Sequence, residues 1–204
     1  MNIPQDGRQY APATQRNREH ILEVLLRVLP EQGNILEIAS GTGEHAVFFA
    51  THLRNSQWLP SDPNPLCRQS IEAWRANFPY NNLYPPINID AREKIWKIEP
   101  NIPIHSIVNI NMIHIAPWTA FLGLLAGANS ILPAGGILYL YGPYKQGENT
   151  AYSNLAFDQS LRRQNPDWGV RELDLVVEEA KIAGFQLREI VPMPANNLSL
   201  LFQL

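Results

Sequence analysis

The sequence predicts an α/β fold with a doubly wound, mostly parallel sheet, and three observations support this prediction. Short apolar runs alternate with helical patterns along the 204 residues, an order typical of βαβ units. Two glycines, Gly41 and Gly43, follow the first buried run, where a parallel strand turns into a helix. The last two apolar runs, Phe185–Val191 and Leu198–Leu204, are joined by a link too short for a crossover helix, so they should pair antiparallel.

The amino-terminal half begins with an irregular stretch, followed by a helix. Isoleucines and leucines recur with helical spacing from about Thr14 to Leu29, and Pro30 and Gly33 end the pattern. The prolines within Leu83–Ile89 indicate that this strand lies at an edge or carries a bulge. The further elements expected here are strands at Asn34–Ala39, Gln57–Ser61 and Leu83–Ile89, and helices at Glu44–Leu53 and Pro65–Phe78.

The carboxyl-terminal half continues the alternation and ends in the hairpin. We expect a Rossmann-like sheet of seven strands, five of them parallel, and a single domain over residues 1–204. Within that domain, residues 1–30 should form an amino-terminal segment and helix that cover the pocket. The elements expected in this half are strands at His105–Asn111 and Gly136–Tyr141, helices at Trp118–Leu132, Ser153–Gln164 and Leu173–Ala183, and a loop at Gly142–Thr150.

The composition argues against several classes of protein. Apolar residues make up 45% of the chain and the net charge is -3, so a core can form and no nucleic acid or anionic membrane is implied as a partner. A single cysteine, Cys67, excludes an internal disulfide and a multi-cysteine zinc site. No signal peptide is recognisable, and Pro117 and glycines interrupt the longest apolar stretch, Ile113–Leu132. We expect a cytoplasmic protein with a small-molecule substrate, and the oligomeric state stays open.

The loop after the first strand, Glu37–Gly43, is the expected cofactor site. Its glycines let a ligand approach the backbone, which a Cβ would block. The string Gly41-x-Gly43-x-x-Ala46 satisfies a relaxed dinucleotide fingerprint. However, Glu44 occupies the first turn of the next helix, where its charge would repel a pyrophosphate. S-adenosylmethionine (SAM) carries no phosphate, so the acidic loop favours SAM over NAD, and a turn without a ligand is the remaining alternative.

Two aspartates follow the next strands. Asp62 ends the second strand, 19 positions after Gly43, and a carboxylate there can accept hydrogen bonds from both ribose hydroxyls. This feature supports a nucleoside without choosing between NAD and SAM, and Asp62 can instead begin the turn before Pro63. Asp90 ends the third strand and can accept from an adenine amino group or cap the following helical stretch.

At these positions the chain resembles class I SAM-dependent methyltransferases, whose pattern is an acidic residue followed by x-Gly-x-Gly-x-Gly. Here it is Glu37-Ile38-Ala39-Ser40-Gly41-Thr42-Gly43, with Ala39 in place of the first glycine. Further blocks are similar to the methyltransferase-like 26 family, also called domain of unknown function 938. These blocks are Arg16–Glu19, Leu36–His45, Asn111–Ile115, Trp168–Arg171 and Pro194–Ser199. The resemblance covers nearly the whole chain and implies the class I methyltransferase fold, SAM as the cofactor and an unidentified acceptor.

The residues expected to hold the cofactor follow the ends of the strands. They are Glu37, Ala39, Ser40, Gly41, Gly43, Asp62, Pro63, Asp90, Ala91, Asn111 and Met112.

The residues on the reacting side are fewer, because methyl transfer mainly requires alignment of acceptor and donor. Asn111 ends the fourth strand, and His114 follows three residues later and can act as a base. In general, however, a histidine between isoleucines is more often a packing residue. We expect substrate contacts at Arg16, Asn17, Tyr144 and Asn154. No metal site is expected, since the histidines lack the spacing of a zinc helix.

The predicted function is therefore transfer of a methyl group from SAM to an acceptor that is unidentified and expected to be a small molecule. The missing catalytic signature leaves a non-catalytic SAM-binding module as an alternative. The relaxed glycine fingerprint together with Asp62 keeps an NAD(P)-dependent oxidoreductase as a further one.

Overall fold

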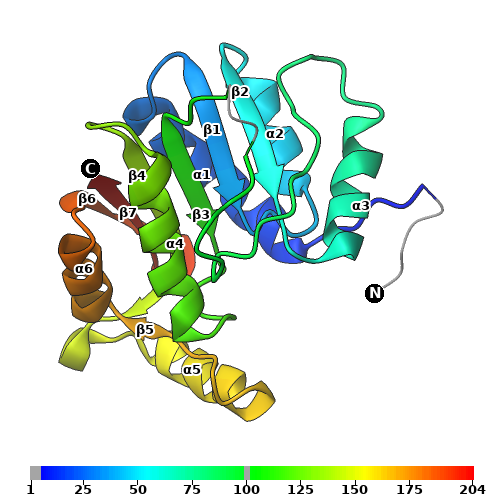
Figure 1. The fold of residues 1–204 in the computed structure, drawn as a ribbon. Helices are drawn as coiled ribbons and strands as arrows, with labels where there is room; N and C mark the ends of the chain where they lie inside the picture. The colour runs from blue at the N-terminus through cyan, green and yellow to red at the C-terminus, as the bar shows by residue number, and fades with distance from the viewer. Residues whose placement is uncertain (1–5, 99–101) are drawn as a thin grey trace. The chain divides into compact units, whose positions relative to one another are not determined.

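The computed structural model describes residues 6–98 and 102–204. Seven strands form a sheet in the order β2-β1-β3-β4-β7-β6, and β5 pairs with β4 (Figure 1). The prediction of a mostly parallel α/β sheet is thereby confirmed. In chain order the elements are α1 (Pro12–Val28), β1 (Gly33–Ile38), α2 (Glu44–His52), β2 (Ser56–Ser61), α3 (Pro65–Arg75), β3 (Ser106–Ile110), α4 (Trp118–Ile131), β4 (Ile137–Lys145), α5 (Tyr152–Gln164), β5 (Arg171–Glu172), α6 (Leu173–Ile182), β6 (Gln186–Met193) and β7 (Asn197–Gln203).

The described residues fall into two compact units. The first unit comprises those of 1–90 and 96–108, and the second comprises 91–95 and 109–204. The strand β3 contributes to both. The expectation of a single domain over residues 1–204 stays a prediction, and residues 1–5 of the expected amino-terminal cover lie outside the described part of the chain.

In the first unit, β1 and β2 run parallel and side by side, with Gly33 opposite Ser56 and Ile38 opposite Ser61 (Figure 1). Each of the two strands has four consecutive buried residues. Burial at successive positions means that both faces of the strands are covered, which is typical of parallel sheets. The helix α3 begins after Asn64, whose side chain accepts a hydrogen bond from the Leu66 amide over 2.9 Å. The largest fully buried side chains of this unit are Ile21, Leu25, Ile35, Leu36, Ile38, Phe49 and Trp58.

The predicted third strand, Leu83–Ile89, is wrong as a continuous strand. Only two isolated bridges form, between Trp58 and Leu83 and between Ser61 and Ile87. The sequence has Pro85 and Pro86 between them, and proline has no N–H to donate to a ladder. The segment therefore follows β2 in an extended form without completing the pairing.

In the second unit, the carboxyl-terminal hairpin is confirmed. β7 runs antiparallel to β4 and to β6, and the pairing with β6 shifts register between Leu187 and Glu189. The link is a short 3-10 helix, Pro194–Asn196. The predicted loop Gly142–Thr150 is wrong in its first part, because β4 continues to Lys145 and pairs with β5, which the sequence did not indicate.

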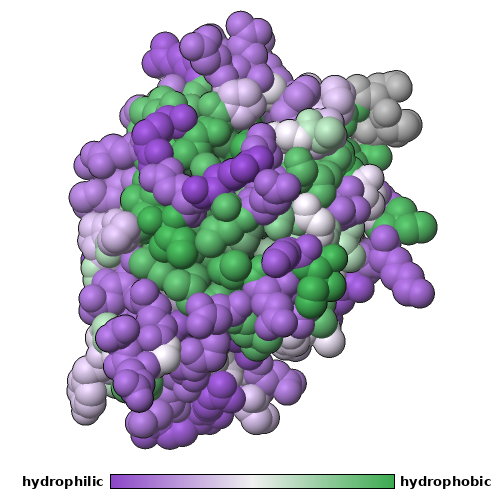
Figure 2. Space-filling model, turned by 90° about the vertical axis from the view of Figure 1, so that its left-hand side faces the viewer, coloured by the Kyte–Doolittle hydropathy of each residue, from purple (hydrophilic) through white to green (hydrophobic). Residues whose placement is uncertain are grey.

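The surface carries scattered apolar side chains. Ile182 of α6 is 73% exposed and Ile95 is 78% exposed. On the face drawn in Figure 2, hydrophobic residues gather in the middle and hydrophilic residues surround them. Within the part of the chain that the structure describes, no helix is long and apolar enough to cross a membrane.

Candidate functional site

A tight elbow leads from β1 into α2 in the first unit. Three of its residues have positive φ angles: Ala39 at 58°, Gly41 at 57° and Gly43 at 88°. Such angles are strained for residues with a Cβ. The Ser40 amide donates to the Ser61 carbonyl over 2.8 Å, which ties the elbow to the end of β2. The sequence-predicted residues of this loop are thus brought together with β2.

Glu37 lies beneath the elbow and is almost fully buried. The indole Nε1–H of Trp58 donates to its Oε2 over 3.0 Å, and the Ser61 hydroxyl donates to its backbone carbonyl over 2.7 Å. Burial raises the pKa of Glu37 to about 7, the nearby charge of Asp62 adds to the rise, and hydrogen bonds from Trp58 and Ser40 oppose it. The Glu37 carboxylate is thus held by the core through Trp58.

Gly41 and Asp62 meet at the mouth of the elbow. The Gly41 amide donates to Asp62 Oδ2 over 3.0 Å. A Cβ at Gly41 would have no heavy atom of the described chain within 4 Å, so the backbone there faces open space. At Gly43, by contrast, a Cβ would lie 2.8 Å from Ile71 Cγ1. Gly41 thus leaves room for a ligand, whereas Gly43 lets α3 pack closely.

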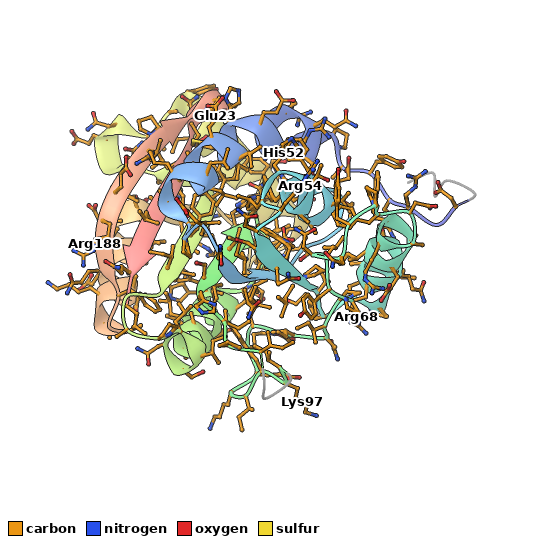
Figure 3. All side chains as sticks on the ribbon, turned by 90° about the horizontal axis from the view of Figure 1, so that it is seen from above. Glu23, His52, Arg54, Arg68, Lys97 and Arg188 are labelled. Carbon is orange, nitrogen blue, oxygen red and sulfur yellow. The ribbon has the colours of Figure 1, made fainter. Side chains whose placement is uncertain are left out.

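Asp62 is buried at the end of β2 and carries several hydrogen bonds. Its Oδ1 accepts from the Asn64 amide over 2.8 Å, and Arg68, labelled in Figure 3, donates from α3 to its backbone carbonyl over 2.8 Å. Burial raises the pKa of Asp62, while the amides of Asn64 and Gly41 and the charge of Arg68 oppose the rise. Each carboxylate oxygen has a second lone pair, so capacity to accept from a ligand hydroxyl remains.

The other predicted cofactor residues are divided between the units: Pro63 and Asp90 belong to the first, and Ala91, Asn111 and Met112 to the second. Pro63 is exposed beside Asp62, and Asp90 is half-buried. In the second unit, Ala91 is buried, and a Cβ at Gly123 would lie 2.1 Å from its carbonyl oxygen. The backbone of Ala91 therefore packs directly against α4.

The amino-terminal segment crosses the elbow of the first unit. The Gln9 amide donates to the Ser70 hydroxyl over 2.8 Å, and that hydroxyl donates to the Thr42 carbonyl over 2.7 Å. The Ala11 amide donates to the Glu44 carboxylate. Sequence reasoning identified Glu44 only as a negative charge; the structure shows that it also anchors this segment.

The two predicted substrate residues of α1 differ in their surroundings. Arg16 is exposed, whereas Asn17 is buried and its Oδ1 accepts a hydrogen bond of 2.9 Å from His45 Nε2. Burial, and then the charge of Arg18, lower the pKa of His45 to about 3, so the ring is neutral. Asn17 thus links α1 to the first turn of α2.

The second unit places Asn111 and His114 beside β4. Asn111 has φ 58°, and its amide donates to the Tyr141 carbonyl over 2.9 Å. A Cβ at Gly142 would lie 3.4 Å from His114 Nδ1 and 3.8 Å from Asn111 Oδ1. Both side chains therefore lie close to the strand at Gly142, at distances where a Cβ would make ordinary van der Waals contact.

His114 is a buried, neutral histidine. Burial, and then the charge of Arg171, lower its pKa to about 4. Its ring packs against Phe157 with the centroids 5.6 Å apart. Its Nδ1 is buried and has no hydrogen-bond partner among residues 6–98 and 102–204, which is uncommon for a buried ring nitrogen. Met112, another predicted cofactor residue, is buried two positions earlier.

Tyr144 and Asn154 are joined by a hydrogen bond. Asn154 Nδ2 donates to the Tyr144 carbonyl over 3.0 Å and to the Asn196 carbonyl over 2.9 Å. The Tyr144 hydroxyl is buried and unpartnered within the described chain, and burial raises its pKa far above the ordinary value. Asn154 thus links α5 to β4 and to the short 3-10 helix at Asn196, whereas the Tyr144 hydroxyl keeps its hydrogen-bonding capacity.

A further residue, Arg171, was missed as a functional candidate. Sequence reasoning noted it only within the block Trp168–Arg171, and no local pattern reveals which carbonyls it binds. Across the described ranges, no group of three or more His, Cys, Asp or Glu side chains is arranged to hold a metal ion.

Solved structures that are similar to this chain include methyltransferases. Human N-acetylserotonin methyltransferase in complex with SAM has a TM-score of 0.75 at 12% identity, covering 94% of this chain and 52% of that one. The SAM-dependent methyltransferase SibL, in its apo form, has a TM-score of 0.76 at 14% identity, covering 94% of this chain and 55% of that one. An O-methyltransferase family 2 protein from Planctomyces limnophilus, in complex with apigenin, has a TM-score of 0.70 at 16% identity, covering 92% of this chain and 61% of that one.

This chain therefore spans about half the length of the solved chains that it matches, and the likeness shows that it has the class I methyltransferase fold. The family model described as "Protein of unknown function (DUF938)" matches residues 8–204. The chain accordingly belongs to the DUF938 family, as the sequence blocks predicted.

Proposed function

We propose that this chain is a SAM-dependent methyltransferase that transfers the methyl group to a small-molecule acceptor. The observation that carries the proposal is the open backbone at Gly41, hydrogen-bonded to the Asp62 carboxylate. A nucleoside seated there places its ribose hydroxyls against a buried carboxylate. The methyltransferases of the same fold, one of them in complex with SAM, support this cofactor. We further propose that residues 1–204 form one methyltransferase-like domain.

The electrostatics of the first unit favour SAM over a dinucleotide. Glu44 is buried in the first turn of α2, and its Oε2 lies 3.5 Å from the Thr42 hydroxyl. A pyrophosphate at this helix end would face that carboxylate. The SAM molecule carries a sulfonium and an ammonium instead, so the same negative charge attracts it.

The remaining assignments are proposed from the sequence. Ala39, Ser40 and Pro63 would contact the cofactor, and so would Asp90, Ala91 and Met112. Asn111 would hold the acceptor or the methionine amine, and His114 would accept a proton if the acceptor must lose one. A neutral imidazole supports the latter role, because only the unprotonated ring can act as a base. Arg16, Asn17, Tyr144 and Asn154 are proposed substrate contacts.

The first test is a thermal-shift series with S-adenosylhomocysteine (SAH), SAM, NADH and NADPH. A ligand that binds the native state raises the melting temperature by mass action, so we expect a rise with SAH and SAM only. Asp62→Asn should weaken SAH binding at least about tenfold, since it replaces a charged acceptor of two hydroxyls. The matched control Asp174→Asn, at an exposed carboxylate of α6, should bind SAH like the wild type. A rise with NADH and none with SAH would refute the proposal.

The second test distinguishes an enzyme from a binding module. The protein is incubated with methyl-labelled SAM and a small-molecule extract, and label is followed by mass spectrometry. Transfer to an acceptor in the wild type, and less in His114→Gln, is the expected result. Binding of SAH without any transferred label would favour a non-catalytic SAM-binding protein.

A further inference from the structure

The segment Trp168–Arg171 takes no part in the proposed cofactor site, yet the second unit packs it against the turn that carries His114. The Gly169 amide donates to the His114 carbonyl over 3.0 Å. A Cβ at Gly169 would lie 2.6 Å from Asp158 Oδ1, so a larger residue would displace the Asp158 carboxylate from its present position. The same Asp158 oxygen accepts a 2.8 Å hydrogen bond from the Val170 amide. The helix α5 thus fixes the segment against the turn.

Arg171 adds three hydrogen bonds from one guanidinium. Its Nε donates to the Ile113 carbonyl over 3.1 Å, and its Nη2 donates to the Ala116 and Asp167 carbonyls over 2.7 Å and 2.8 Å. Two of these acceptors lie on either side of His114 in the chain. Because the guanidinium is a planar, rigid fork, it fixes both sides of the turn at once.

The turn has little support of its own. The Ile115 amide donates to the Met112 carbonyl over 2.9 Å, while Asn111 at its start has a left-handed φ of 58°, which costs free energy outside glycine. The imidazole of His114 is not anchored through Nδ1 to any described residue. The turn around His114 therefore depends on neighbouring residues to keep the imidazole in one position.

We infer that Arg171 is a positioning residue, whose guanidinium holds the turn so that the His114 imidazole stays beside the bare backbone of Gly142. The chemical role of His114 rests on the proposed function, but the positioning is a property of this turn alone. An additional contact supports it: the Arg171 guanidinium lies over the ring of Trp118, 5.6 Å from its centroid. The start of α4 is thereby held by the same side chain.

The test reads the His114 ring directly in the full chain. Diethyl pyrocarbonate modifies accessible neutral imidazoles, and mass spectrometry gives the rate at each histidine. In the wild type His114 should react slowly, because it is 5% exposed. In Arg171→Met its rate should rise about tenfold or more, since each lost charge-assisted hydrogen bond shifts a local opening equilibrium by about that factor. His45, buried in the first unit, is the internal reference and should not change.

A second readout separates charge from geometry. The pKa of His114, measured by NMR, should rise above about 4 in Arg171→Met, because the charge of Arg171 is removed, while burial continues to hold the pKa below its ordinary value. Arg171→Lys keeps the charge without the fork, so the pKa should stay low while the modification rate rises in part. Arg163→Met, at an exposed guanidinium that binds the Gln159 carbonyl, is the matched control and should leave both readouts unchanged.

Each outcome decides the inference. Unchanged His114 reactivity and pKa in Arg171→Met, or equal changes in Arg163→Met, would overturn it. If Arg171→Met does not fold, Arg171→Lys decides, and a His114 rate equal to the wild type would then refute the positioning role. SAH binding, measured on the same proteins, tests the proposed function separately: its absence in the wild type would refute methyl transfer and leave the reading of His114 intact.

Discussion

Replacing Gly41 and Gly43 by alanine, one at a time, distinguishes a glycine that leaves room for a ligand from one that lets a helix pack. Both have left-handed φ angles, 57° and 88°, so alanine at either costs about 1–2 kcal/mol of folding free energy. At Gly43 the new methyl group would also lie 2.8 Å from Ile71 Cγ1 and 3.1 Å from Ile71 Cα. Such overpacking costs about 1–3 kcal/mol more.

We therefore expect Gly43→Ala to lose about 2–5 kcal/mol of unfolding free energy and Gly41→Ala about 1–2 kcal/mol. Urea denaturation of the ligand-free proteins measures both values. For SAH affinity we expect the opposite order, with Gly41→Ala losing more than Gly43→Ala. The reason is that the Gly41 methyl group would intrude where no described atom lies within 4 Å. A steric loss of about 1–3 kcal/mol corresponds to roughly 5–150-fold weaker binding by calorimetry. If Gly41→Ala binds SAH like the wild type, the elbow does not hold the cofactor.

Three further predictions follow from buried groups and backbone strain. The pKa of Glu37 is raised from 4.5 to about 7 in the fold, so the native state binds a proton that the unfolded state releases. Between pH 4.5 and about 7 the unfolding free energy should therefore fall by about 1.4 kcal/mol per pH unit. In urea denaturation at several pH values, Glu37→Gln should lose this pH dependence, whereas Glu72→Gln, at an exposed site, should keep it. Tyr144→Phe should leave the unfolding free energy unchanged or raise it by up to about 1 kcal/mol, since the Tyr144 hydroxyl lacks a partner in the described chain. Tyr139→Phe removes a hydroxyl with a 2.6 Å hydrogen bond and should lower the unfolding free energy by about 1–2 kcal/mol. Equal effects in the two variants would contradict this reasoning. Ala39→Gly should raise the unfolding free energy by up to about 1 kcal/mol, because it relieves a left-handed φ of 58°; a loss would show that the methyl group makes a contact that matters more.

The sequence was most informative where structure depends on local pattern. Alternating apolar runs predicted the sheet, and a short link predicted the antiparallel pairing of β6 and β7. The same reasoning predicted a strand at Leu83–Ile89 with an edge position or a bulge at its prolines, but it did not predict that Pro85 and Pro86 reduce the pairing to two isolated bridges. It also missed β5, since two residues carry no periodicity.

The sequence predicted where the site lies in the chain, but it did not predict the separate role of each residue. Spacing placed Gly41, Gly43 and Asp62 near one another, and the hydrogen bond between Gly41 and Asp62 agrees with that placement. Which glycine faces open space and which faces Ile71 depends on a residue of α3 that lies 28 positions after Gly43 in the chain. The hold of Arg171 on the turn around His114 likewise arises from tertiary contacts, which no short motif encodes.

A crystal structure of the protein with SAH tests the cofactor site most directly. We expect the two ribose hydroxyls to lie about 2.6–2.8 Å from the Asp62 carboxylate oxygens, with the ligand against the backbone of Gly41. Density for SAH at any other place in the fold, with the elbow empty at saturating ligand, would contradict it.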